Sequence, residues 1–173
     1  MPGHVILSHG SDSGPEATKV SALARVAETL GWSTFRPDYR DEDKLGYAGC
    51  VPPRVARLLD VMQGQPRPLV LAGSSMGAFV SGLASLRAPC DGLFLIALPV
   101  DIPGCPQCFD AAQGVPGMLV HGYRDEMCPV DAAVAFTRER GMPALLLDDD
   151  HRLGNHVAML ERQFELFLHT VEA

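Results

Sequence analysis

Short apolar runs alternate with longer amphipathic stretches along the whole chain. The apolar runs are continuous and do not alternate with polar residues, which is typical of strands buried on both faces of a parallel sheet. Five segments have this character: His4–Ser8, Leu69–Ala72, Leu93–Leu98, Met118–His121 and Ala144–Leu147. Ser33–Arg36 is more polar but can form a further strand. The pattern predicts a doubly wound α/β fold with six parallel strands.

The stretches between these runs have the spacing of amphipathic helices. From Pro15 to Leu30, apolar residues recur every three or four positions, and Gly31 follows as a residue that commonly ends helices. The other stretches of this kind are Val55–Met62, preceded by prolines suited to a first helical turn, Met76–Leu86, Ala132–Arg140 and His156–Val171. Helices between parallel strands cover both faces of the sheet, so we expect a three-layer α/β/α architecture.

Two segments depart from the alternation of strand and helix. Residues 37–49 are polar, and we expect a loop there. Residues 99–117 stand where another helix would be expected, but their prolines and glycines favour a loop with one short helical turn.

Length, charge and cysteine content limit the class of protein. A chain of 173 residues fits one domain spanning 1–173, and its net charge of −7, spread along the chain, argues against a nucleic-acid partner. No apolar run approaches the ~20 residues of a membrane span, and no basic segment precedes the first apolar run as in a secretory signal. Five cysteines at irregular spacing indicate reduced thiols. We therefore expect a cytoplasmic protein that binds neither nucleic acid nor membrane; the oligomeric state is not indicated.

One motif carries chemistry. The apolar run 69–72 leads into Gly73-Ser74-Ser75-Met76-Gly77 and then into a helical pattern, so a G-x-S-x-G sequence lies at a strand-to-helix turn. This is the setting of a nucleophile elbow, in which a sharp turn presents Ser75 above the sheet. The Met76 backbone N–H, at the start of the helix, suits an oxyanion hole. The alternative is a glycine-rich turn with an idle serine.

A second oxyanion donor is expected in the loop that follows the first strand. His9-Gly10-Ser11 lies there, and we assign the role to the Ser11 backbone N–H. His9 is expected to brace this loop through hydrogen bonds and not to act in catalysis.

A serine nucleophile needs a base that titrates near neutral pH, which selects histidine. In the chain order serine, carboxylate, histidine, the candidates are His151, directly after the last strand, and His156, whose alternative role is a residue of the first helical turn. We assign the base to His151.

The carboxylate that orients the base is expected in the loop after the strand that precedes the last one. Asp125 lies there and is assigned this role, with Asp101, after the fourth strand, as the alternative. The run Asp148–Asp150 is interpreted as a solvated turn at a strand end.

With these residues in this order, the chain resembles the small, lidless serine esterases and thioesterases of the α/β-hydrolase superfamily. The resemblance spans nearly the whole chain. The segments that carry it are Ser8-His9-Gly10, Gly73–Gly77, His121–Asp125 with Pro129-Val130, and Asp150–Leu153.

The resemblance implies hydrolysis of an ester or thioester through an acyl-enzyme, without cofactor or metal. It implies a triad of Ser75, Asp125 and His151, with Ser11 and Met76 at the oxyanion hole. Two leading antiparallel strands and a helical lid found in larger members are missing. An open site for small or short-acyl substrates is therefore expected, lined by Met76, Leu98, Pro99, Ile102, Phe109 and Met127.

Other signals are weaker. Gly10–Gly14 follows a strand as a phosphate loop does, but lacks the Lys-Ser/Thr pair. Cys105-Pro106-Gln107-Cys108 has redox or half-zinc spacing, but no second pair accompanies it. The alternative functions are a serine peptidase or amidase, and a binding module whose triad is idle.

Overall fold

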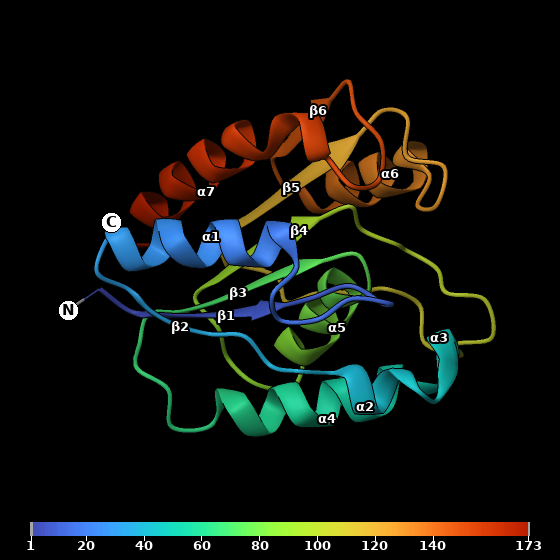
Figure 1. The fold of residues 1–173 in the computed structure, drawn as a ribbon, viewed down its shortest axis with the longest axis horizontal. Helices are drawn as coiled ribbons and strands as arrows, with labels where there is room; N and C mark the ends of the chain where they lie inside the picture. The colour runs from blue at the N-terminus through green and yellow to red at the C-terminus, as the bar shows by residue number, and fades with distance from the viewer. Residues whose placement is uncertain (1, 173) are drawn as a thin grey trace.

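The sheet contains six parallel strands, as the apolar runs predict. A computed structural model describes residues 2–172, and its sheet has the strand order β2-β1-β3-β4-β5-β6 with every neighbouring pair parallel (Figure 1). The strands are β1 (His4–Ser8), β2 (Ser33–Phe35), β3 (Leu69–Ser74), β4 (Gly92–Ile96), β5 (Gly117–Gly122) and β6 (Ala144–Leu147). The predicted α/β fold with a six-stranded parallel sheet is confirmed.

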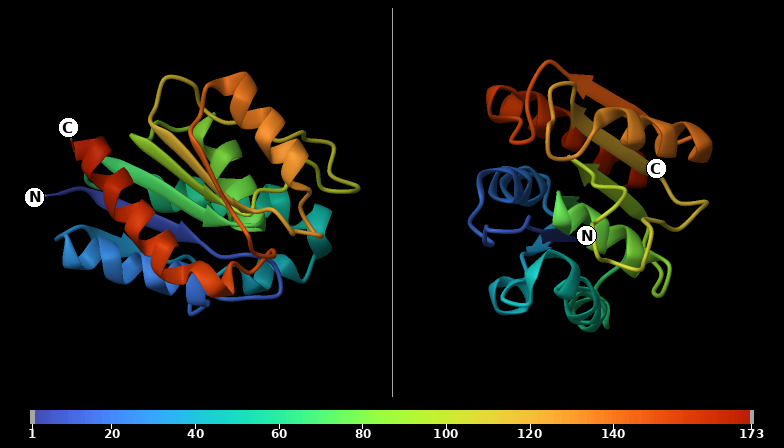
Figure 2. Two further views of the ribbon diagram at one scale, coloured as in Figure 1. Left: turned by 90° about the horizontal axis from the view of Figure 1, so that it is seen from above. Right: turned by 90° about the vertical axis from the view of Figure 1, so that its right-hand side faces the viewer.

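Helices cover both faces of this sheet and make three layers (Figure 2). The long helices are α1 (Thr18–Thr29), α4 (Val51–Met62), α5 (Met76–Ser85), α6 (Val130–Arg140) and α7 (Val157–Glu172). Helices α1 and α7 lie side by side over one face, whereas α4, α5 and α6 cover the other. Each face has its own apolar cluster: Phe94 packs between Phe164 and Phe167 beneath α7, and Phe79 of α5 packs against Phe109.

The polar segment 37–49 was expected to be a loop, and this prediction is wrong in part. It contains two short helices, α2 (Arg40–Asp43) and α3 (Gly46–Gly49), neither of which has a fully buried residue. A four-residue helix is too short to show apolar periodicity, and here α2 is held by tertiary contacts such as the ion pair between Asp43 and Arg54 of α4.

The segment between β4 and β5 is a loop, but it lacks the expected helical turn. Its backbone forms instead a tight turn closed by the Cys105 N–H, which donates to the Ile102 carbonyl oxygen over 2.9 Å. The helix expected from His156 begins at Val157 and is preceded by the 3-10 turn η1 (Gly154–His156).

Parallel order places the carboxyl ends of all six strands at one edge of the sheet. The segments that follow β1, β3, β5 and β6 meet at this edge, and they carry the residues singled out in the sequence. No helix within residues 2–172 is long and apolar enough to cross a membrane.

Candidate active site

Ser75 lies on the sharp turn between β3 and α5. Its φ of 55° and ψ of −119° are strained for a residue with a side chain, as a nucleophile elbow requires. Its N–H donates to the Ile96 carbonyl oxygen over 2.9 Å, which ties the turn to β4. Gly77 allows α5 to approach β1, because a Cβ atom there would lie 2.0 Å from the Ser8 carbonyl oxygen.

Ser75, His151 and Asp125 are joined by two hydrogen bonds. The Nδ1 atom of His151 lies 2.7 Å from Asp125 Oδ2, and its Nε2 atom lies 3.0 Å from Ser75 Oγ. An ionised carboxylate only accepts hydrogen bonds, so Nδ1–H donates to Asp125 and Nε2 accepts from the Ser75 hydroxyl. In this tautomer the ring can receive the serine proton.

The Asp125 carboxylate is buried and held from several sides. Its Oδ1 atom accepts the backbone N–H groups of Met127, at 2.9 Å, and Cys128, at 2.7 Å. Burial alone would raise the pKa of Asp125, but the hydrogen bonds from His151 and the Cys128 N–H outweigh it and hold this pKa below its usual value. The group is thus a fixed anion at neutral pH.

A cavity of about 720 Å³ opens beside Ser75 at the carboxyl edge of the sheet. Ser11 and Met76, the residues expected to supply oxyanion donors, both line it, as do Ser75 and His151. Of the pocket residues expected from the sequence, Met76, Pro99, Ile102 and Met127 are present.

The other two expected pocket residues lie elsewhere. Leu98 and Phe109 are buried in the apolar cluster under α4 and α5, where the Phe109 ring packs against Phe79 and Phe136. Their assignment to the pocket is wrong, because the segment after β4 folds inward at these positions.

His156 and Asp101, the alternative base and carboxylate, lie outside the hydrogen-bonded group of Ser75, His151 and Asp125. His156 bonds through Nδ1 to Asp149 Oδ2 over 2.8 Å. Asp101 is exposed at the cavity wall. Asp149 is buried, contrary to the expectation of a solvated turn: it accepts from Asn155 and His156, and these bonds, His156 first, lower its pKa to about 2.

His9 is buried and braces the loop after β1, in agreement with its expected role. Its Nε2 atom accepts the Tyr39 N–H over 3.0 Å, so its Nδ1–H is the donor to the Gly10 carbonyl oxygen at 2.7 Å.

Lys19 and His121 contact the loops that carry His151 and Asp125, and neither was identified from the sequence. Lys19 of α1 reaches the loop that carries the base and donates from Nζ to the backbone oxygens of His151 and Arg152, each at 3.2 Å. His121, at the end of β5, lies 3.4 Å from Asp125 Oδ2 and donates from Nε2 to the Cys128 carbonyl oxygen. The only sign of this role in the sequence was the position of His121 within an otherwise apolar strand.

One group of potential metal ligands exists within residues 2–172: Asp125, Cys128 and His151, whose donor atoms lie within 4.8 Å of one another. The oxygens and ring nitrogens of this group are already engaged in the hydrogen bonds described above. Burial raises the pKa of the Cys128 thiol to about 12, so it is protonated at neutral pH and a poor metal ligand. The donor set fits proton transfer better than metal binding.

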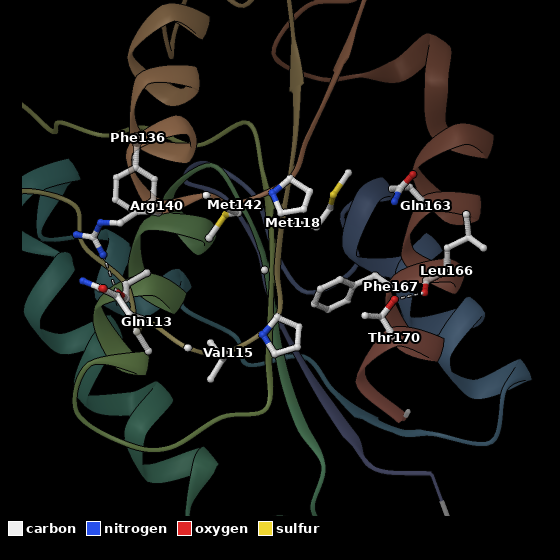
Figure 3. A pocket seen from close by; sticks show the side chains of 17 residues that line it. Gln113, Val115, Met118, Phe136, Arg140, Met142, Gln163, Leu166, Phe167 and Thr170 are labelled. Atoms are coloured by element: carbon white, nitrogen blue, oxygen red, sulfur yellow. Dashed lines mark hydrogen bonds between the residues drawn. The ribbon is translucent and has the colours of Figure 1, made fainter.

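A second cavity, of about 480 Å³, lies at the opposite edge of the sheet, where β5 begins between α6 and α7 (Figure 3). Among the residues that the structure describes there, its lining contains no serine, cysteine, histidine or acidic residue. The lining includes Met118, Phe136, Gln163 and Phe167. Reactive groups are concentrated in the first cavity.

Comparison with solved structures decides the family. A protein of the alpha/beta hydrolase superfamily from Xanthomonas campestris pv. campestris is 43% identical to this chain, with 97% of this chain and 99% of that chain covered and a TM-score of 0.92. This chain belongs to the alpha/beta hydrolase superfamily. Membership supports a hydrolase activity.

More distant structures share the fold. An alpha-beta serine hydrolase homologue from Coxiella burnetii is 22% identical over 96% of this chain and 85% of that chain, with a TM-score of 0.75. Est1E from Butyrivibrio proteoclasticus is 18% identical over 98% and 88%, with a TM-score of 0.77. No protein-family model and no curated protein matches the chain.

Proposed function

We propose that the protein is a serine hydrolase that cleaves small or short-acyl carboxylic esters or thioesters through an acyl-enzyme on Ser75. The observation that carries the proposal is the pair of hydrogen bonds linking Asp125 to His151 and His151 to Ser75, on a strained turn that opens into a cavity. Membership of the hydrolase superfamily adds support.

In the proposed reaction, Ser75 Oγ attacks the carbonyl carbon while its proton passes to His151 Nε2. Asp125 stabilises the resulting imidazolium through Nδ1. The negative oxygen of the tetrahedral intermediate receives hydrogen bonds from the Met76 and Ser11 N–H groups. Collapse breaks the bond to the leaving alkoxide or thiolate, which takes the proton from His151 and leaves an acyl group on Ser75.

Water completes the cycle. His151 Nε2 removes a proton from a water molecule, which attacks the acyl-enzyme and forms a second tetrahedral intermediate. Collapse of that intermediate breaks the bond to Ser75 Oγ and returns the proton to the serine. A carboxylic acid is released, and no cofactor takes part.

The acyl preference is argued from the cavity walls. Between β4 and β5, where larger members insert a helical lid, this chain has the loop 97–116, which contributes Pro99, Ile102 and Pro103 to the cavity. Without a covering helix, a long acyl chain would extend beyond the cavity into solvent, and the part outside would bury little apolar surface. In a series of nitrophenyl esters, kcat/KM is expected to peak at short chains, and a maximum at long chains would contradict this preference.

Labelling with a fluorophosphonate tests the mechanism directly. Intact-mass measurement is expected to show one adduct on the wild-type protein and none on Ser75→Ala, with loss of ester cleavage in the same variant. Ser74→Ala is the matched control, because Ser74 is adjacent but belongs to β3, and it is expected to keep the adduct. An unlabelled wild-type protein would identify a binding module with an idle triad.

A serine peptidase or amidase uses the same three residues on a poorer leaving group. Peptide and ester panels on the purified protein distinguish the two activities, and turnover of peptides faster than esters would favour the alternative.

A further inference from the structure

Arg54 of α4 is a fully buried cation close to the proposed active site. Its side chain has no exposed surface, and its guanidinium forms a two-point ion pair with Asp43 of α2, with Nε and Nη2 each 2.6 Å from a carboxylate oxygen. The guanidinium also lies over the Tyr39 ring, 4.6 Å from its centre. Burying a charge is costly unless its hydrogen bonds are satisfied, so its remaining contacts are informative.

Those contacts are with the backbone of residues 9–11, the loop after β1 that is proposed to supply an oxyanion donor and is called the oxyanion loop below. Arg54 Nη1 donates to the His9 carbonyl oxygen over 2.7 Å, and Nη2 donates to the Gly10 carbonyl oxygen over 3.1 Å. His9 adds a second hydrogen bond to the Gly10 oxygen. Two successive peptide groups are thus held at their oxygen atoms.

Holding the oxygens fixes where the N–H groups point. A trans peptide group is planar, with its N–H directed opposite to its C=O. The N–H groups of Gly10 and Ser11 belong to the two peptide groups that Arg54 holds, and both therefore point away from the guanidinium. Within residues 2–172 the Ser11 N–H donates to no protein group.

This loop lies directly against the nucleophile. A Cβ atom placed on Gly10 would lie 3.4 Å from Ser75 Cβ, and Ser11 lines the cavity that contains Ser75. An oxyanion donor acts only if it is aimed before the charge develops, because reorientation during the reaction costs free energy.

We propose that Arg54, held by Asp43, is a positioning residue that orients the Gly10 and Ser11 N–H groups toward the oxyanion formed at Ser75. The proposal rests on the proposed function, because it assigns a purpose to the oxyanion loop. Arg54 acts through the backbone and does not touch the substrate.

The variants Arg54→Lys and Asp43→Asn test this role. Lysine keeps the charge but cannot hold two carbonyls and a carboxylate with a planar fork; Asp43→Asn leaves Arg54 in place and is the milder change if Arg54→Lys does not fold. Arg57→Lys is the matched control, because Arg57 lies on the same helix and pairs with Glu42 of α2 over 3.0 Å but has an exposed side chain.

Steady-state kinetics on a short-chain nitrophenyl ester give the first readout. For both test variants, kcat is expected to fall about 10- to 100-fold. KM should change less than about 3-fold, because oxyanion donors act mainly on the transition state, and the midpoint of the pH–rate profile should be unchanged, because the base is not altered. The control should retain kcat within about 2-fold. Folded test variants that keep the wild-type kcat would overturn the proposal.

NMR relaxation of the Gly10 and Ser11 amide nitrogens gives a second readout that needs no activity. In the wild type and the Arg57→Lys control, the order parameters of these N–H groups are expected to be near the ~0.85 of rigid backbone, and in the test variants they are expected to fall toward ~0.6. Unchanged order parameters would overturn the proposal. If the wild-type protein neither cleaves esters nor reacts with the fluorophosphonate, the proposed function fails. Lower order parameters in the variants would then still support Arg54 as the group that orients the loop.

Discussion

Two hydrogen bonds align the side chains of Ser75, His151 and Asp125 for the proposed reaction. A serine hydroxyl is a weak nucleophile, and it gains reactivity from a base aligned to take its proton. Here Asp125 holds the base in this alignment, because the carboxylate is buried and is itself fixed by two backbone N–H groups. The precision of the group therefore depends on the residue farthest from the substrate.

Replacing Asp125 with asparagine tests this dependence. An amide can donate to His151 Nδ1 and so favour the wrong tautomer, and kcat for ester cleavage is expected to fall by ~10⁴. Asp101→Asn is the control, since Asp101 is the other carboxylate considered for this role and lies at the same cavity. A larger loss in Asp101→Asn than in Asp125→Asn would contradict the assignment.

The helix α5 packs closely against β1 at Gly77, a residue without a side chain. At the turn between β3 and α5, the approach of α5 to β1 is possible because Gly77 has no Cβ atom. The same contact brings the loop after β1 next to Ser75. The packing of α5 against β1 thus positions both Ser75, the proposed nucleophile, and the loop proposed to bind the oxyanion.

Gly77→Ala is expected to separate these elements. The added methyl group would overlap the Ser8 carbonyl oxygen, and the free energy of unfolding should fall by about 3 kcal/mol or more, or roughly 6–12 °C in Tm. Gly154→Ala serves as the control, because a Cβ atom there meets nothing within 4 Å and its φ is not positive. Equal melting temperatures for the two variants would show that α5 can move at little cost.

Asp149 connects the end of β6 to the turn η1 that precedes α7. Its carboxylate accepts from the Asn155 backbone and from the His156 ring, across the loop that carries His151. Because its pKa in the folded state, about 2, is below its unfolded value of 3.8, its ionisation stabilises the fold above pH ~4. That contribution is lost as the pH falls through the folded pKa.

Asp149→Asn is therefore expected to lower stability at neutral pH, by about 2 kcal/mol, or roughly 4–8 °C in Tm. The difference from the wild type should shrink as the pH falls from about 4 toward 2. Thermal melts from pH 7 to pH 2 measure it, with Asp148→Asn, an exposed neighbour paired with Arg124, as the control. A difference that grows on acidification would be the wrong sign for this explanation.

At the scale of the whole molecule, the sheet separates two environments. The cavity at the carboxyl edge contains the reactive side chains, and the cavity at the amino edge lies between α6 and α7 without them. Parallel topology produces this division, because every strand delivers its following loop to the same edge.

A bulky residue at each edge tests the division. Ala17→Trp, at the cavity beside Ser75, is expected to lower kcat/KM for esters by about 10-fold or more by occupying the space for substrate. Ala112→Trp, at the cavity of Figure 3, should leave kcat/KM within about 2-fold. The opposite ranking would place the site at the amino edge.

The sequence by itself was sufficient for the architecture. Buried strands and amphipathic helices leave periodic signals, so all six strands and the five long helices were located within a few residues. The serine at the turn was recognisable because the elbow is local: strand, G-x-S-x-G and helix follow one another directly. The chain order of strand ends also selected Asp125 and His151 from among the acidic residues and histidines.

What only the tertiary structure decided depends on contacts between distant segments. The helix α2 has no periodic signal, because it has only four residues, and the pairing of Asp43 with Arg54 holds it in place. Leu98 and Phe109 were misplaced because apolar residues of a loop can face either a cavity or the core, and no local rule distinguishes the two. The supporting contacts of Arg54 and Lys19 likewise join residues 44 to 133 positions apart. Periodicity in the sequence shows which face of a segment is buried. The residues that pack against that face are determined by the fold of the whole chain.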